Sequence, residues 1–527
     1  MNNSFCLVDG RIYLSFKPTR IVSSLVVVNG RVIYAGDRDK AKDLANLIDL
    51  KVVDLKGKVV LPGFVDSHVH LDELGMYLEM LDLRDVESIE DLKRKLSSYT
   101  GRGKWILGHG WDQEKLKEKR FPTRWDLDDV IRDKPVMLTR ICLHAAVLNT
   151  KAMEITGLLK IDDPDVIKNE NGDPIGVVVE KAFEKAREKM KEDLTQEDYM
   201  RFLRNAVDFA ASQGVTTVGF VSCDRKSLMA LHRLNSEKKL KIRVRVYLNP
   251  DILEPLKNLG IRRGFGDEFL RINGLKILAD GSLGARTAWL SEPYSDSSTS
   301  GGPNINREEL MKIAEEADKN GLQLAIHGIG DKTIDMILDV YEKVGASGKR
   351  HRIEHASVTR DDQIARISKL GVVVSVQPHF IVSDWWVVKR VGEKRARWVY
   401  RFKKMLLSGI NLCFGTDCPV ENLNPWETLH AAVTRGGKSL PLYEITKEEC
   451  LDLEEALYCY TKGSAYALFD EDNLGSLEEG KLADFIVLNE DSFETKDLRK
   501  LKILETYVGG VRIFSAIDRV DYAPESQ

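Results

Sequence analysis

Strand-length apolar runs alternate with amphipathic helical segments through most of this 527-residue chain, and this alternation restricts the fold more than any other feature. The runs lie at residues 64–70, 215–222, 242–248, 274–280, 322–328, 351–357, 372–378 and 411–417. Helical segments such as 307–321, 331–345 and 360–371 stand between them, and each ends on a glycine that suits a helix C-cap. Eight strands alternating with helices predict an α/β fold, the (β/α)8 TIM barrel.

The two ends of the chain have a different pattern, that of short strands and turns. Residues 23–37 hold two β-rich runs around Asn29-Gly30, which is typical of a hairpin. Strand patterns return near the C-terminus in GKLADFIVLNED and ILETYVGGVRIFS. We expect residues 1–62 and 469–527 to pair into one small β-domain around a barrel of residues 63–468. A long insertion at 72–195, after the first barrel strand, would overhang the active-site face of the barrel.

Composition excludes several classes of protein. Acidic and basic residues interleave to a net charge of −4, which gives no case for a nucleic-acid partner. No apolar stretch approaches the ~20 residues of a membrane helix, and the N-terminus lacks a signal-peptide pattern. The seven cysteines are scattered without a CxxC pair, which argues against disulfides and a thiolate zinc site. We therefore expect a soluble cytoplasmic protein with a small-molecule substrate.

A set of nitrogen and oxygen ligands occurs at the ends of the predicted strands. His68 and His70 are two residues apart on the first strand and therefore point to the same face, although isolated histidines of this kind are also found as structural residues. Later strands carry candidate residues toward their C-terminal ends, where catalytic residues of this fold lie. These are Lys276, His327, His355 and Asp417. Imidazoles with a carboxylate suit zinc and, less selectively, other first-row divalent metals.

Lys276 is the unusual member of this set because an ammonium ion repels cations. If Leu275 and Ile277 desolvate the amine, it loses its proton and can react with carbon dioxide. The carbamate formed is an anion whose two oxygens can bridge two metal ions. The alternative is an ordinary lysine paired with Asp280 or another acid.

The motifs PGFVDSHVHL, LKILADGSLGARTA, AIHGIGD, RIEHA, VSVQPHF and FGTDCPV resemble those of the amidohydrolase superfamily. The similarity is to its amidohydrolase 3 branch, which includes N-substituted formamide deformylase, and it covers nearly the whole chain. The resemblance implies a β-sandwich built from both termini around a distorted barrel. It also implies a site for one or two metals with the ligands His68, His70, Lys276, His327, His355 and Asp417.

Such a site predicts a metal-dependent hydrolase of carbon–nitrogen bonds other than peptide bonds. A metal-bound hydroxide is the expected nucleophile, and Asp417 the expected general base. One alternative is a mononuclear deaminase-like enzyme with an ordinary Lys276. Deamination at a ring carbon needs a proton donor, commonly a glutamate in the region of the fifth strand, and the motif AIHGIGD offers Asp331 but no glutamate. Another alternative is a non-catalytic regulatory protein that retains the fold.

Several further residues are candidates for other roles. We expect substrate contacts from Trp111, His144, Arg286 and His379, each with a structural role as the alternative. Glu354 directly precedes His355 on a strand, so alternation predicts that it points away from the barrel interior. His351 is not expected to be a ligand. The sequence leaves the oligomeric state open; barrels of this type often pair, so a homodimer is one option.

Overall fold

A computed structural model describes residues 3–99, 101, 103–141 and 144–517. The chain divides into two compact units, one made of residues 1–71 and 207–527, and the other of residues 72–206. Among the described residues, no helix is both long enough and apolar enough to cross a membrane.

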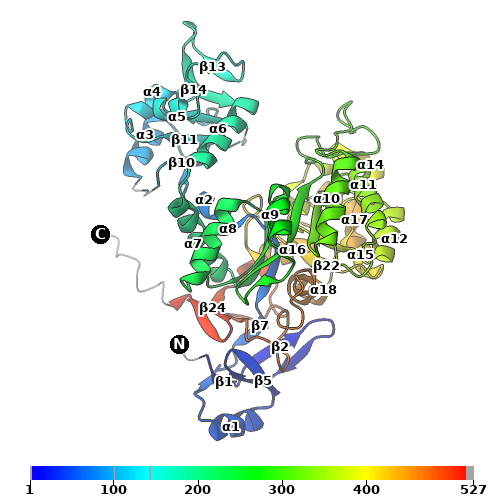
Figure 1. Ribbon diagram of the computed structural model, residues 1–527. Coiled ribbons are helices and arrows are strands. Elements are labelled where there is room, and N and C mark those ends of the chain that lie inside the picture. Colours follow the sequence, from blue (N-terminus) through cyan, green and yellow to red (C-terminus); the bar gives the residue numbers. More distant parts are fainter. Residues whose placement is uncertain (1–2, 100, 102, 142–143, 518–527) are drawn as a thin grey trace. The chain divides into compact units, whose positions relative to one another are not determined.

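The first unit contains a nearly closed barrel of parallel strands (Figure 1), which confirms the predicted fold. Its sheet order is β22-β21-β20-β19-β18-β16-β15-β8. The strands are β8 (Phe64–Val69), β15 (Val215–Cys223), β16 (Arg243–Leu248), β18 (Leu270–Leu278), β19 (Gln323–Gly328), β20 (Arg352–His355), β21 (Val373–Val376) and β22 (Leu412–Phe414). The last strand meets the first where the Asp417 amide donates to the His68 carbonyl at 2.8 Å and the His70 amide donates to the Cys418 carbonyl at 2.9 Å. Every predicted run overlaps one of these strands, although β15 extends to Cys223 and β18 begins at Leu270, outside their predicted runs.

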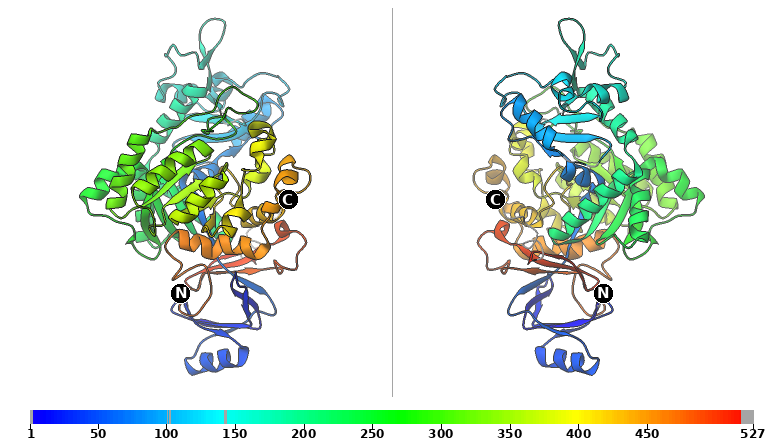
Figure 2. Two further views of the ribbon diagram at one scale, coloured as in Figure 1. Left: turned by 90° about the vertical axis from the view of Figure 1, so that its right-hand side faces the viewer. Right: turned by 90° about the vertical axis from the view of Figure 1, so that its left-hand side faces the viewer.

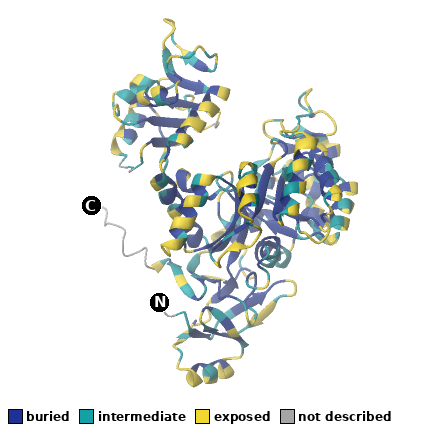
Figure 3. Ribbon diagram, in the orientation of Figure 1, coloured by how far each residue is buried: buried dark blue, intermediate teal, exposed yellow. Residues whose placement is uncertain are grey.

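Helices follow the barrel strands and turn their exposed faces away from the buried sheet (Figure 3). They are α8 (Arg225–Ser236), α9 (Leu253–Asn258), α10 (Arg307–Lys319), α11 (Asp331–Lys343), α12 (Asp361–Leu370), α13 (Phe380–Ser383), α14 (Val387–Ala396), α15 (Phe402–Leu407), α16 (Pro425–Thr434), α17 (Pro441–Thr446), α18 (Leu453–Tyr458) and α19 (Ser464–Ala467). The three predicted helices are confirmed as α10, α11 and α12. Gly321, Gly345 and Gly371 follow them with φ of 66°, 64° and 63°, the left-handed conformation that ends a helix.

Strands from both termini build two further sheets, as predicted (Figure 2). One has the order β5-β4-β1-β6 and the other β25-β24-β23-β7-β2-β3. The strands are β1 (Phe5–Val8), β2 (Arg11–Ser15), β3 (Arg20–Val22), β4 (Ser24–Val28), β5 (Arg31–Gly36), β6 (Val52–Asp54), β7 (Val59–Pro62), β23 (Phe485–Leu488), β24 (Ile503–Val508) and β25 (Val511–Ser515), with helix α1 (Arg38–Leu47) between β5 and β6. Asn29 and Gly30 have φ of 50° and 75°, which is the backbone of the predicted two-residue hairpin turn. Phe5, Ile12 and Phe485 share one core, so the β-domain needs both ends of the chain.

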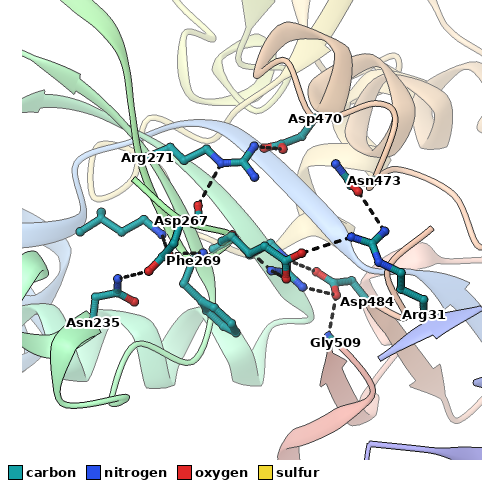
Figure 4. A network of polar contacts seen from close by, with 12 residues as sticks. Arg31, Asn235, Asp267, Phe269, Arg271, Asp470, Asn473, Asp484 and Gly509 are labelled. Carbon is teal, nitrogen blue, oxygen red and sulfur yellow. Dashed lines mark hydrogen bonds and ion pairs between the residues drawn. The ribbon is translucent and has the colours of Figure 1, made fainter. Parts of the chain in front are cut away.

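Buried charges tie the first residues of barrel strands to the segment that leads back to the β-domain (Figure 4). Arg243 Nε and Nη2 donate to the Asp484 carboxylate at 2.8 and 3.0 Å. Asp484 also accepts from the Gly509 amide at 2.7 Å. Asp470 receives the guanidinium groups of Arg245 and Arg271. These ion pairs lock residues 470–509 onto one end of the barrel.

The second unit is a six-stranded sheet with the order β13-β14-β12-β11-β10-β9 and its own hydrophobic core. Its strands are β9 (Leu81–Asp82), β10 (Ile106–Trp111), β11 (Val136–Arg140), β12 (Ala145–Leu148), β13 (Val166–Lys168) and β14 (Pro174–Val179). Its helices are α2 (Leu71–Glu79), α3 (Ile89–Ser98), α4 (Arg124–Asp128), α5 (Thr150–Ile155) and α6 (Glu180–Asp193), and α7 (Gln196–Ser212) continues past its boundary. The insertion thus forms a compact unit that extends beyond residue 195.

Replacing Asp484 by asparagine tests the buried ion pair. The Arg243 charge, only 1% exposed, would lose its nearest carboxylate and keep only Glu268 at 3.8 Å, and removing one partner of a buried pair costs about 3–5 kcal/mol. Chemical unfolding followed by tryptophan fluorescence measures this loss. The control is Asp208→Asn, which breaks an exposed pair with Lys241 and should cost about 1 kcal/mol or less. Equal effects of the two variants would contradict the assignment.

The buried His351 side chain should make the folded state less stable in acid. Its Nδ1 accepts from the Leu324 amide at 3.1 Å, and burial lowers its pKa to about 4 although Asp318 opposes the shift. Because the unfolded imidazole takes up a proton near pH 6.5, its contribution is fully present above that pH and is lost as the pH falls toward 4. The wild-type unfolding free energy should therefore decrease by about 3 kcal/mol more than that of His351→Gln over this window. Identical pH profiles would contradict the prediction.

Candidate metal centre

Six side chains from five barrel strands meet at the carboxyl ends of those strands. The His68 and His70 ring centroids lie 5.7 Å apart, and the His355 ring lies 5.0 Å from His68. The His327 ring lies 4.4 Å from the His355 ring. Lys276 Nζ is 3.3 Å from His68 Nε2, and Asp417 Oδ1 is 3.0 Å from His70 Nε2. All six residues of the predicted ligand set thus form one contiguous cluster.

His68, His70 and Asp417 have the geometry of a metal site. Each offers one ligand atom, and these atoms lie within 4.8 Å of one another. Asp417 Oδ1 is buried, and it makes no hydrogen bond to the residues that the structure describes. Its contacts of 3.0 Å to His70 Nε2 and 3.3 Å to His68 Nε2 are close without hydrogen-bond alignment. A divalent ion would satisfy this oxygen, and the imidazole and carboxylate donors suit zinc.

The protein orients His327 and His355 through one ring nitrogen each. His327 Nε2 lies 3.0 Å from the Gly281 carbonyl, and His355 Nδ1 lies 2.7 Å from Gln377 Oε1. Both partners are acceptors, so these nitrogens carry the protons. The other nitrogens, His327 Nδ1 and His355 Nε2, keep the lone pairs that a metal requires.

Lys276 is a buried amine rather than part of a salt bridge with Asp280. Burial lowers its pKa from the ordinary lysine value, while the Glu354 and Asp417 carboxylates oppose the shift. Asp280 instead accepts from the Ile329 and Gly330 amides at 3.1 and 2.9 Å. This environment favours the neutral amine that a carbamate needs.

The prediction for Glu354 is wrong. Its Oε2 lies 2.5 Å from His68 Nδ1, and the side chain is fully buried inside the barrel. Strand alternation ends at His355, whose φ of 72° is left-handed. Glu354 and His355 can therefore both face the cluster. The sequence offered one signal for this position: Glu354 stands two residues after Arg352 on a buried strand, so the two charges share one face and can pair inside the barrel. Although burial opposes it, Arg352 and His68 hold the pKa of Glu354 well below its usual range.

Two predicted substrate contacts of the first unit already have charged partners. Arg286 Nε and Nη2 donate to Asp296 at 3.0 and 2.9 Å. His379 Nδ1 lies 2.5 Å from Glu421 Oε2, and this contact raises the His379 pKa although burial opposes the shift. Phe380, the neighbour of His379, stacks on His355 with ring centroids 6.2 Å apart.

The other two predicted contacts lie in the second unit. Trp111 is fully buried in its core, and its indole Nε1 donates to the Leu138 carbonyl at 2.7 Å. The His144 side chain is 63% exposed and lies 3.7 Å from Glu180. Trp111 therefore has the environment of a packing residue, whereas His144 is open to solvent.

Comparisons with known proteins find relatives in both sequence and fold. A metal-dependent hydrolase of Pyrococcus horikoshii OT3, itself described as uncharacterized, is 47% identical and superposes with a TM-score of 0.87 over 94% of this chain and 99% of that one. Protein LONG AFTER FAR-RED 3 of Arabidopsis thaliana is 32% identical, covering 96% of this chain and 91% of its own. N-substituted formamide deformylase of Arthrobacter pascens is 27% identical, covering 93% and 94%.

The model of the amidohydrolase family matches residues 51–514. This range includes the barrel, the insertion, the part of the β-domain from β6 onward and every residue of the candidate metal centre. The chain therefore belongs to the amidohydrolase family.

Proposed function

We propose that the protein is a metal-dependent hydrolase of carbon–nitrogen bonds outside the peptide class. The observation that carries the proposal is the convergence of His68, His70 and Asp417 around a buried carboxylate oxygen that has no hydrogen bond among the described residues. We propose zinc as the ion, because imidazole and carboxylate donors favour it. When bound, such an ion makes water acidic near neutral pH and polarises a carbonyl oxygen.

Asp417 is the general base of this proposal. Its neighbours His68 and His70 hold its pKa well below the usual carboxyl range despite burial, so it is ionised at neutral pH. An ionised carboxylate can take a proton from the attacking water and deliver it to the leaving nitrogen. The Asp417 amide donates to the His68 carbonyl at 2.8 Å, which fixes the base beside the first-strand histidines.

Lys276, His327 and His355 support a second ion. The neutral Lys276 amine would attack carbon dioxide, form a nitrogen–carbon bond and release one proton to leave a carbamate anion. Its Nζ lies 3.3 Å from His68 Nε2, and His355 links His68 to His327 through ring distances of 5.0 and 4.4 Å. We propose that the carbamate joins these two groups of ligands.

The proposed substrate is a small amide such as an N-substituted formamide. The A. pascens relative carries that activity in its name, and Phe380 places an aromatic ring against His355. The deaminase alternative has less support, because Asp331 accepts from the Ser291 amide at 2.9 Å and from Arg360 Nη1 at 2.8 Å. A carboxylate engaged in this way is poorly placed to exchange protons with a substrate.

Purification without chelator should yield one or two divalent ions per chain by elemental analysis. The preparation should hydrolyse members of a panel of formamides, amides, carbamates and lactones, lose activity with chelator, and regain it with zinc or manganese. A carbamate should add the mass of one carbon dioxide under gentle ionisation. Trace metal with no turnover after zinc or manganese is added would favour a non-catalytic protein instead, and one ion with an unmodified Lys276 would remove the carbamate.

Asp417→Asn should lower kcat by about 10²–10⁴-fold, the usual contribution of a general base. Metal content measured on the same sample separates lost proton transfer from lost metal. The control is Asp361→Asn, which alters an exposed acid paired with Arg401 and should leave kcat unchanged. An Asp417→Asn enzyme that keeps its metal and its full turnover would contradict the assigned base.

A further inference from the structure

His68 has close neighbours at both ring nitrogens. Nε2 lies 3.3 Å from both Asp417 Oδ1 and Lys276 Nζ, inside the metal centre. Nδ1 lies 2.5 Å from Glu354 Oε2 on the opposite side of the ring. An ionised carboxylate only accepts hydrogen bonds, so Nδ1 carries the proton and Nε2 presents its lone pair to the ligand cluster.

Glu354 is in turn held on both oxygens. Arg352 Nε donates to Oε1 at 2.7 Å, and Arg352 Nη2 donates to Oε2 at 2.7 Å. Arg352 Nη2 also donates to the Ser67 carbonyl at 2.9 Å, which connects the guanidinium to the residue before His68. The Arg352 guanidinium carbon lies 4.7 Å from the centroid of the Tyr247 ring. The carboxylate therefore has little freedom to turn away from His68.

Fold stability alone explains this arrangement poorly. The Arg352 and Glu354 side chains are both fully buried, and such pairs can often be replaced by apolar residues without loss of stability. Arg352 Nη1 is buried with no hydrogen-bond partner among the described residues, so the pair does not even satisfy its own donors. A role toward His68 accounts for a buried carboxylate at this position.

We propose that Glu354, held by Arg352, is a positioning residue that fixes the tautomer and ring orientation of His68 and strengthens Nε2 as a ligand for a divalent ion. The inference rests on the proposed function, because it requires a metal at this centre. It extends that function because it makes metal affinity depend on Glu354, a residue outside the predicted ligand set.

Metal affinity of the metal-free protein provides the test. Titration with Co²⁺ followed by visible absorption, and with Zn²⁺ in competition with a chelator, gives Kd for each variant. Glu354→Gln should weaken binding by about 10–100-fold, as loss of such an outer partner typically does. Asp484→Asn is the matched control, since it breaks the buried pair with Arg243 and should leave Kd at the wild-type value.

Glu354→Gln leaves the Arg352 charge unpaired, so the double variant Arg352→Met with Glu354→Gln removes both charges and guards against a folding failure. It should unfold cooperatively and bind metal as weakly as the single variant. Folded variants with wild-type Kd would overturn the inference, and so would a double variant that cannot fold, because the pair would then be structural. Wild-type protein that binds no metal overturns the proposed function as well, whereas metal-binding wild type with unaffected variants overturns this inference alone.

Discussion

The closed ring of parallel strands is the constraint on which the site depends. Parallel strands present their carboxyl ends at one edge, and closure brings the edges of β8 and β22 together although about 350 residues separate them. The two hydrogen bonds that join His68 and His70 to the segment after β22 are part of this closure. The backbone contacts that complete the barrel therefore also place Asp417 beside the first-strand histidines.

Buried charge within the barrel is divided between two tasks. At the amino ends of strands, Arg243 and Arg245 pair with Asp484 and Asp470 and hold the returning C-terminal segment. At the next-to-last position of β20, Glu354 faces His68 and is held by Arg352. Ion pairs inside the barrel thus hold the C-terminal segment at one end of the strands and support the candidate metal centre at the other end.

Desolvation sets the chemical state of the centre. Burial lowers the pKa values of His68, Lys276 and His355, and it favours the neutral nitrogens that metals and carbon dioxide require. The pKa of Asp417 is held well below its usual range although burial opposes this shift. One enclosed environment thus supports neutral nitrogen donors beside an anionic base.

The sequence alone determined the eight strands, the strand patterns of both termini and the strand positions of the six candidate ligands, because apolar periodicity and the position of a residue on its strand are local properties. Glu354 could not be predicted in this way. Alternation places it opposite His355, and only the left-handed backbone at His355 and Ala356 lets both face the cluster. The tertiary structure likewise decided the partners of Arg286 and His379 and the burial of Trp111. It also decided that Asp417 Oδ1 is buried without a hydrogen bond among the described residues. Each depends on contacts between segments distant in sequence, and a pattern within one segment carries no information about what the folded chain places against it.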